Sequence, residues 1–393
     1  MPFILPRQLV ETEDLALVLA FGRVSVLEAC SILRGLVQRA EAPCERVSVL
    51  RLQPPSPTRL TELAGSHKCA PLMGTIHDVP GGIDRIVNGI TSHLDERGNL
   101  SLSGYDISDD DYEALVRFLL DRVREAGFRK VHLLRPKGNE LLAEQVVSRA
   151  ALDVIAFPYH DGIGLGLTAW VPDSPSMRRR GAEKPLPHSE ISMSPRLARV
   201  LLNLAGLRHG QTVLDPFCGS GTILAEALTM SLRCLGLDAK ASRVKDARRN
   251  LAWLSGGVAN SGYDIRVGDA RGLRRMVGRS KVDAVVTEPL LLPRIEARPK
   301  TSTASDLINE AGNVYADALA SMADVLQPGG RIVVVVPVIQ TMDGDEVSLA
   351  LDGHRLGLRL YQPGPVGFQY PVMLSFESTR WVRRAVYVFE SKS

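Results

Sequence analysis

A turn of eight residues, Asp215 to Thr222, combines the residue types and spacing that best suit ligand chemistry in this sequence. It reads Asp-Pro-Phe-Cys-Gly-Ser-Gly-Thr and joins a short apolar segment to a segment with helical periodicity. Gly219 and Gly221 allow the backbone to approach a ligand closely, and the start of a helix offers unpaired N–H groups. The spacing fits neither the dinucleotide motif GxGxxG nor the phosphate loop GxxxxGK(S/T), which disfavours both of these nucleotide interpretations.

Three further acidic residues recur at equivalent positions, each directly after another predicted strand. Asp238 ends the next strand, where an acidic side chain can accept hydrogen bonds from ribose hydroxyls. Asp269 follows the third strand and Glu288 the fourth. Each of them alone is more commonly a solvated carboxylate or a helix cap. Together with Asp215 they predict a ligand site along one edge of a parallel sheet.

The elements that position these acids alternate regularly between strand and helix after residue 191. The pattern predicts an α/β fold, a Rossmann-like, doubly wound and largely parallel sheet over residues 191–393, with an antiparallel pair near the end. The expected strands are 212–215, 234–238, 264–267, 282–287, 331–338 and 385–389, and the expected helices are 195–205, 222–230, 241–254 and 305–326.

The first part of the chain, residues 1–170, predicts a separate α+β region. Its expected strands are 15–21, 47–52, 131–134 and 153–157, and its expected helices are 25–36, 109–126 and 140–150. Residues 171–190 combine several prolines with the basic triplet Arg178, Arg179 and Arg180, and they predict a linker between two domains.

Composition limits the function classes. The chain has 393 residues with 47 basic and 44 acidic side chains, a balance too even to indicate nucleic-acid binding by itself. No apolar run reaches the ~18 residues of a membrane span, and no secretory signal is recognisable at the start. The five cysteines form neither a disulfide framework nor a metal-binding CxxC pair, and the eight histidines do not cluster. We therefore expect a cytoplasmic protein without a metal, in which Cys218 is a packing residue rather than a nucleophile.

The ordered motifs resemble those of S-adenosylmethionine-dependent methyltransferases: the Asp215–Thr222 turn, then Gly-Leu-Asp-Ala, Gly-Asp-Ala-Arg and a proline-containing turn. Within that class the chain is similar to RNA methyltransferases with an N-terminal THUMP domain, in particular the archaeal tRNA (guanine-N2) methyltransferases that act on guanosine 10. Residues 188–205 resemble the segment that precedes the cofactor strand in this family. Residues 15–36 resemble its ferredoxin-like start, and residues 63–68 resemble its junction into THUMP.

The resemblance implies roles for individual residues. The Asp215 turn would hold the amino acid part of S-adenosyl-L-methionine, Asp238 its ribose, and Asp269 its adenine. The residues implied for cofactor binding are Asp215, Phe217, Gly219, Ser220, Gly221, Thr222, Asp238, Ala239, Asp269 and Ala270. The implied partner is tRNA, with a small activator subunit as a further candidate. Those expected to contact RNA are Lys68, Arg178, Arg179, Arg180 and Lys184, although a solvated linker face explains the last four equally well.

The turn after the fourth strand departs from the family pattern of Asp or Asn, two prolines and an aromatic residue. This chain has Thr287-Glu288-Pro289-Leu290-Leu291-Leu292 there. Glu288 and Pro289 are the predicted catalytic residues, because the acid can still accept a hydrogen bond from an amine. Leu291 cannot stack on a base, so a modified base pocket and a plain apolar loop both remain open. Phe368, Tyr370 or Trp381 could supply the missing ring.

The sequence thus predicts methyl transfer to an exocyclic base amine, with guanine N2 of tRNA as the favoured acceptor. Two alternatives remain open. One is an RNA-binding protein that keeps the cofactor pocket but has weak or no transfer activity. The other is a methyltransferase of the same fold that acts on another RNA position or on DNA.

Overall fold

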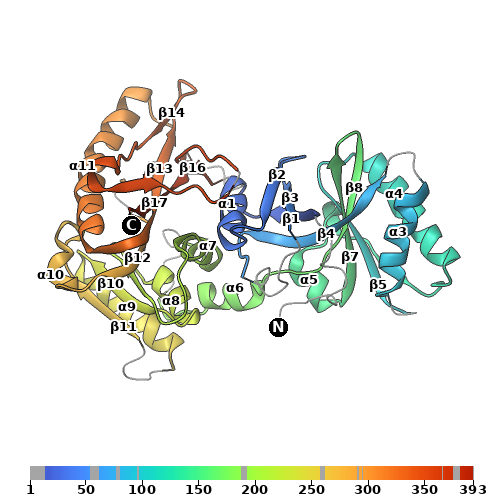
Figure 1. Cartoon of the computed structure of the whole chain (residues 1–393), viewed down its shortest axis with the longest axis horizontal. Helices are drawn as coiled ribbons and strands as arrows, with labels where there is room; N and C mark the ends of the chain where they lie inside the picture. The colour runs from blue at the N-terminus through green and yellow to red at the C-terminus, as the bar shows by residue number, and fades with distance from the viewer. Residues whose placement is uncertain are drawn as a thin grey trace. The chain divides into compact units, whose positions relative to one another are not determined.

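The chain folds into two compact units in the computed structural model (Figure 1). The structure describes residues 14–53, 62–76, 80–94, 97–186, 193–256, 262–289, 292–293, 295–364, 366–374 and 381–392. The first unit comprises Met1–Pro175 with Gly364–Val366, and the second comprises Ser176–Pro363 with Gly367–Ser393. The predicted linker is partly helical, because α6 spans Ser174–Ala182. Among the described residues, no helix has the length and apolar character needed to cross a membrane.

The first unit is built on an eight-stranded mixed sheet in the order β2-β3-β1-β4-β8-β7-β5-β6. Its long strand β4 pairs antiparallel with β1 on one side and β8 on the other, so it joins the two halves of the sheet. The strands are β1 (Asp14–Leu19), β2 (Val37–Glu41), β3 (Val47–Leu52), β4 (Ser66–Ile76), β5 (Asn99–Gly104), β6 (His132–Leu134), β7 (Ala151–Tyr159) and β8 (Gly162–Leu167).

The helices of the first unit are α1 (Arg23–Ile32), α3 (Pro80–Thr91), α4 (Asp109–Glu125) and α5 (Ala143–Ser148). The predicted helix 109–126 is confirmed as α4, which Ser108 caps by accepting a hydrogen bond from the Asp111 N–H. Its buried side chains, including Leu115, Leu119 and Val123, pack with apolar residues of β5 and β7 in one core cluster.

The second unit has the predicted Rossmann-like sheet. Strands β9 (Thr212–Asp215), β10 (Arg233–Asp238), β11 (Tyr263–Val267), β12 (Val282–Thr287) and β13 (Leu326–Gln340) pair in parallel, in the order β11-β10-β9-β12-β13. Antiparallel β17 (Val382–Ser391) and β15 (Leu358–Leu360) continue it, so the predicted strand 385–389 lies inside the sheet and β15 at its edge. Short strands β14 (Glu346–Ser348) and β16 (Val372–Met373) pair with β13 and β17.

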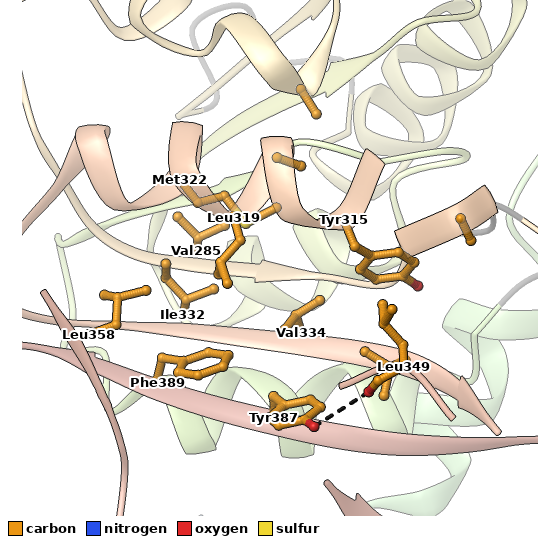
Figure 2. Packing of buried hydrophobic residues seen from close by; sticks show 14 of the residues in the cluster. Val285, Tyr315, Leu319, Met322, Ile332, Val334, Leu349, Leu358, Tyr387 and Phe389 are labelled. Atoms are coloured by element: carbon orange, nitrogen blue, oxygen red, sulfur yellow. Dashed lines mark hydrogen bonds between the residues drawn. The ribbon is translucent and has the colours of Figure 1, made fainter. Parts of the chain in front are cut away.

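Helices of the second unit are α7 (Pro195–Ala205), α8 (Thr222–Thr229), α9 (Ala241–Leu254), α10 (Arg274–Val277) and α11 (Thr301–Val325). Figure 2 shows how α11 covers the sheet: Tyr315, Leu319 and Met322 face apolar side chains of β12, β13 and β17. The Tyr387 hydroxyl on β17 donates a 3.4 Å hydrogen bond to the carbonyl of Leu349. This core holds the strands in register, and their carboxyl ends form the edge that carries the predicted acids.

Candidate active site

The backbone of the turn between β9 and α8 requires glycine at positions 219 and 221. Gly219 and Gly221 have φ values of +51° and +84°, in the region that disfavours other residues. A Cβ at Gly221 would lie 2.7 Å from Cδ1 of Leu251, whereas a Cβ at Gly219 would meet nothing nearer than 4.0 Å. Gly221 is therefore fixed by close helix packing, and Gly219 leaves open space beside the turn.

Asp215 is the buried anchor of this turn, with 1% of its surface exposed. Its Oδ1 accepts hydrogen bonds from the Thr287 hydroxyl at 2.7 Å and from the Phe217 N–H at 3.2 Å. The pKa of Asp215 is raised to about 7, mainly by burial, with a smaller contribution from the nearby negative charges of Asp238 and Glu288 and an opposing one from the two hydrogen bonds. The structure thus brings together three of the four predicted acids closely enough for their charges to interact.

Asp238 supports the same turn from the end of β10. Its Oδ2 accepts a 3.0 Å hydrogen bond from the Gly219 N–H, and its Oδ1 accepts a 2.9 Å bond from the Lys240 N–H. The side chain is half-buried, and the neighbouring Ala239 is exposed. One carboxylate therefore joins the turns that follow two adjacent strands, a role that the sequence pattern did not indicate.

Asp269 differs from the other acids because it is exposed and paired. It caps a short 3-10 helix (Ala270–Gly272), accepting a 2.9 Å hydrogen bond from the Arg271 N–H. The Arg271 guanidinium also donates to both of its oxygens, and these bonds lower the pKa of Asp269 to about 2. Ala270 is buried in the core beside it. Asp269 is thus presented as a carboxylate at the sheet edge.

Glu288 follows β12 directly and faces a partner that the sequence analysis missed. Its Oε1 lies 2.5 Å from Nε of Arg384, and only 9% of the Glu288 side chain is exposed. Arg384 lies on β17, opposite Pro337 of β13. Pro289 is buried, and its carbonyl accepts a 2.9 Å hydrogen bond from the Tyr315 hydroxyl. In the predicted catalytic turn, Arg384 of the sheet therefore holds the Glu288 side chain, and Tyr315 of α11 holds the backbone at Pro289.

The residues considered for base stacking have different surroundings. Leu290 and Leu291 lie outside the described residues, and Leu292 packs against the core below α11. Phe368 is buried, and the Tyr370 hydroxyl donates to the Tyr361 carbonyl at 2.7 Å. Trp381 is half-buried, and the Arg298 guanidinium lies 4.7 Å from its ring centre. Of the three aromatic candidates, Trp381 is the one that directly precedes β17, the strand of Arg384.

Lys68 was predicted to contact RNA, and the structure shows that this prediction is wrong. The side chain is completely buried, and its Nζ donates to Oδ2 of Asp153 at 2.7 Å and to the Ser103 hydroxyl at 2.8 Å. Asp153 also accepts hydrogen bonds from the hydroxyls of Ser101 and Thr168. Lys68 therefore neutralises a buried acid inside the first unit, where it cannot reach a phosphate.

The three arginines of the basic triplet, Arg178 to Arg180, lie in different environments. Arg178 and Arg179 are exposed on α6, and Arg179 lies 3.8 Å from the Glu183 carboxylate. The prediction that all three arginines face RNA is wrong for Arg180. Its guanidinium donates to both oxygens of the buried Glu226 on α8, at 2.5 and 2.9 Å. Arg199 of α7 donates to the same acid at 3.2 Å. The Arg180 side chain thus anchors α6 within the second unit.

Lys184 also differs from the expectation of a surface phosphate contact. It is buried, and its Nζ donates a 3.2 Å hydrogen bond to the hydroxyl of Thr222 at the start of α8. Burial lowers the pKa of Lys184. The side chain lines a small hollow together with Ser220, Gly221 and Asn250. Lys184 therefore lies beside the Asp215–Thr222 turn, unlike the exposed Arg178 and Arg179.

Comparison with known proteins identifies the class of the second unit. Residues 187–343 match the family model described as RMKL-like, methyltransferase domain. TrmN from Thermus thermophilus has a similar fold: the structures superpose with a TM-score of 0.50 at 21% identity, covering 96% of this chain and 99% of TrmN. The second unit thus carries the match to a methyltransferase domain, in agreement with the class predicted from the sequence.

Relatives with this domain act on tRNA according to their names. The chain is 37% identical over 146 residues to the tRNA (guanine(10)-N2)-dimethyltransferase of Methanothermobacter thermautotrophicus, and 32% identical over 147 residues to that of Pyrococcus abyssi. It is 36% identical over 149 residues to the tRNA (guanine(6)-N2)-methyltransferase of Thermus thermophilus. The first two matches cover 37% of this chain and 39% of each relative.

The part of the chain that the structure describes contains no group of three His, Cys, Asp or Glu side chains that could hold a metal ion. The two residues that sequence reasoning missed, Arg271 and Arg384, pair with acids that it had found. Arg271 stands two positions after its acid, so a local search for opposite charges could have found it. Arg384 is on another strand, and no sequence signal marks it.

Proposed function

We propose that the protein is an S-adenosylmethionine-dependent RNA methyltransferase that modifies an exocyclic base amine, with guanine N2 of tRNA as its acceptor. One observation carries the proposal: Asp215, Asp238 and Glu288 lie at the carboxyl edge of one parallel sheet, close enough for their charges to interact. Ligands of open α/β sheets bind at this edge. The methyltransferase family of the domain and the names of its relatives support the same assignment.

The residues present suit this cofactor. Gly219 leaves room beside the turn, and Asp238 at the next strand end offers a carboxylate to ribose hydroxyls. The gathered negative charge suits a positively charged sulfonium group. When bound, S-adenosylmethionine supplies the methyl group on that sulfonium. Asp269 and Ala270 follow β11 and would border the adenine.

Glu288 would hold the acceptor. In the proposed reaction the amine nitrogen forms a bond to the methyl carbon, and the electron pair of the broken S–C bond stays on sulfur. The nitrogen then releases one proton. Glu288 directly follows β12, the strand that pairs with the strand of Asp215, and would accept a hydrogen bond from the amine and then this proton. Buried Pro289 restricts the backbone of the turn, so the acid starts from a fixed position.

RNA binding would come from the first unit, which we propose to be the ferredoxin-like and THUMP region, and from Arg178 and Arg179 on α6. Both arginine side chains are exposed. A tRNA substrate places the protein in the cytoplasm, and a small activator subunit would be a further partner. Boundaries near residues 170 and 191 for the two domains belong to the same proposal.

A second candidate function is RNA binding with weak or no methyl transfer. The specific observation in its favour is the ion pair of Glu288 with Arg384, which engages the acid that would hold the amine. Transfer to another RNA position or to DNA is the remaining alternative, because the turn carries leucines where the related enzymes have an aromatic residue.

The test is methyl transfer by the full chain. Unmodified tRNA transcripts, another RNA and duplex DNA are incubated with labelled S-adenosylmethionine, and modified nucleosides are identified by mass spectrometry. We expect N2-methylguanosine from tRNA, slower transfer by Glu288→Gln and none by Glu288→Ala. Exposed Glu296 lies on the same loop, so Glu296→Gln is the matched control and should keep wild-type activity. Wild-type protein that binds the cofactor and tRNA but transfers no methyl group would favour the RNA-binding candidate.

A further inference from the structure

The ion pair between Glu288 and Arg384 spans two strand spacings of the sheet. Glu288 follows β12, Arg384 lies on β17, and β13 separates the two strands. Thr287 of β12 is level with Val334 of β13, and Arg384 is level with Pro337. Neighbouring strands are ~4.8 Å apart, so the Arg384 side chain must extend across β13 to bring its Nε within 2.5 Å of Oε1. An arginine side chain is long enough for this reach.

The burial of the pair distinguishes it from an ordinary surface ion pair. The side chains of Glu288 and Arg384 are 9% and 29% exposed. Exposed pairs contribute little because water competes for both charges, whereas removing one partner of a buried pair leaves an uncompensated charge. Arg383, the next residue, forms a contrasting pair: its Nη1 lies 2.9 Å from Glu346, a strand residue with 46% of its side chain exposed.

A glutamate at this position needs a restraint that a shorter acid does not. Its additional methylene adds a rotatable bond, so its carboxylate can occupy more positions relative to the end of β12. Displacement of a reacting or orienting group by ~1 Å can reduce a rate by ~100-fold. A guanidinium that holds one carboxylate oxygen through a directional N–H bond removes much of this freedom.

We propose that Arg384 is a positioning residue that fixes the carboxylate of Glu288 for the amine of the methyl acceptor. The inference rests on the proposed function, and it explains how a glutamate can serve where the turn would otherwise hold a shorter side chain. Arg384 acts through Glu288 and has no contact of its own with the reacting atoms. A lysine at the same place would keep the charge but lose the planar donor group, so it would restore the position only in part.

Steady-state methyl transfer by Arg384→Met, Arg384→Lys and the control Arg383→Met separates this role from its alternatives. We expect Arg384→Met to lower kcat by ~10–100-fold at a temperature where it stays folded, while leaving the affinity for S-adenosylmethionine near wild type. Its melting temperature should fall, because the Glu288 carboxylate loses this partner. Arg384→Lys should recover part of the loss, and Arg383→Met should behave like wild type. Wild-type kcat in Arg384→Met, or a loss of S-adenosylmethionine affinity as large as the loss of kcat in both Arg384 variants, would overturn the inference.

Two further measurements keep the test decisive. In a Glu288→Gln background, which we expect to keep slow transfer, Arg384→Met should lower kcat much less than it does in the wild-type protein, because a positioning residue acts through its acid. An equal loss in both backgrounds would mean that Arg384 acts independently of the Glu288 carboxylate. A crystal structure of Arg384→Met should show Glu288 in more than one rotamer; a single unchanged rotamer would contradict positioning. A wild-type protein without transfer overturns the proposed function and this inference together, whereas active wild type with unaffected Arg384→Met overturns the inference alone.

Discussion

The Thr287 hydroxyl donates a 2.7 Å hydrogen bond to Oδ1 of Asp215, and so links the last residues of β12 and β9 inside the protein. Asp215 begins the cofactor turn, and Thr287 directly precedes Glu288. The two turns that would carry donor and acceptor are thus fixed to each other by one buried side-chain contact. A substitution of Thr287 or Asp215 that removes this hydrogen bond should therefore alter both turns.

Asp215 should make the second unit less stable as the pH rises from about 4 to 7. Its folded pKa is about 7, above the ~3.9 of an unfolded aspartate. A raised carboxyl pKa adds stability that is complete below the unfolded value and is lost as pH rises through the folded value. Relative to Asp215→Asn, the wild-type free energy of unfolding should fall by a few kcal/mol, on the order of 1.4 per pKa unit.

Urea denaturation at a series of pH values measures this difference. Asp269→Asn is the control of opposite sign, because the pKa of Asp269 is lowered to about 2. Its contribution is present above pH ~4 and is lost as pH falls toward 2, and its exposure makes the effect small. Parallel stability curves for wild type and Asp215→Asn would show that the aspartate ionises normally.

Gly221→Ala should destabilise the second unit and weaken cofactor binding. The new Cβ would combine a positive φ with a 2.7 Å approach to Leu251. The φ cost is ~1 kcal/mol, and overpacking adds ~1–3 kcal/mol. Gly210→Ala is the matched control, since Gly210 has φ +81° but nothing within 4 Å of its Cβ. Equal melting temperatures for the two variants would refute the close-packing account.

Asp238→Ala should weaken the binding of S-adenosylmethionine by more than tenfold in calorimetry. The substitution removes the proposed ribose acceptor and the support that its Oδ2 gives to the Gly219 N–H. A charged hydrogen bond of this type contributes ~1.5–3 kcal/mol. Asp264→Ala is the control, because that exposed acid on the neighbouring strand pairs with Arg266. Unchanged affinity in Asp238→Ala would remove the ribose assignment.

Lys68→Met should strongly destabilise the first unit, by ~3–5 kcal/mol, because it leaves the buried charge of Asp153 without its partner. The double variant Lys68→Met, Asp153→Asn should recover much of this loss, and exposed Lys130→Met should have little effect. Chemical denaturation monitored by circular dichroism measures all three. A Lys68→Met protein as stable as wild type would contradict a stabilising role for this ion pair.

Replacing Arg178 and Arg179 together by alanine should weaken the binding of every tRNA alike. Phosphate contacts depend on salt, so the slope of log affinity against log salt should fall by ~0.9 per lost duplex contact, or ~0.7 for single strands. Filter binding at several salt concentrations measures the slope. Cofactor affinity serves as the internal control, because both side chains are exposed on α6. An unaltered slope would assign both arginines to a solvated helix face.

The elements of the second unit were predictable because their patterns are local. The strands 212–215 and 282–287 and the helices 195–205 and 241–254 have the predicted bounds. Apolar runs of strand length alternate there with amphipathic helices, and each acid follows its strand. The gathering of these acids at one edge of the sheet could therefore be predicted from the order of the strands in the sequence, since parallel strands end at the same edge.

The first unit was less predictable, because several of its strands have weak strand signals. β8 is Gly-Ile-Gly-Leu-Gly-Leu, and a Cβ at Gly164 would lie 2.9 Å from Tyr159 Cβ. β4 contains Pro71 and Gly74. Glycine and proline disfavour strands in isolation, and their places here follow from tertiary packing. Lys68 was misassigned for the same reason: no local pattern reveals that a lysine is buried opposite an acid far along the chain.

The strand order of the second unit also has a consequence for the sequence of events during protein synthesis. Glu288 leaves the ribosome well before Arg384, since α11, β13 and β15 are translated between them. The strands β9 to β13 are all synthesised before β17, but a domain folds as a unit, so the sheet is complete only once β17 has been made. The ion pair between Glu288 and Arg384 can form only after β17 has been synthesised. A nascent chain would thus contain the Asp215–Thr222 turn before it contains Arg384, and the pairing of Glu288 with Arg384 would be one of the last steps of maturation.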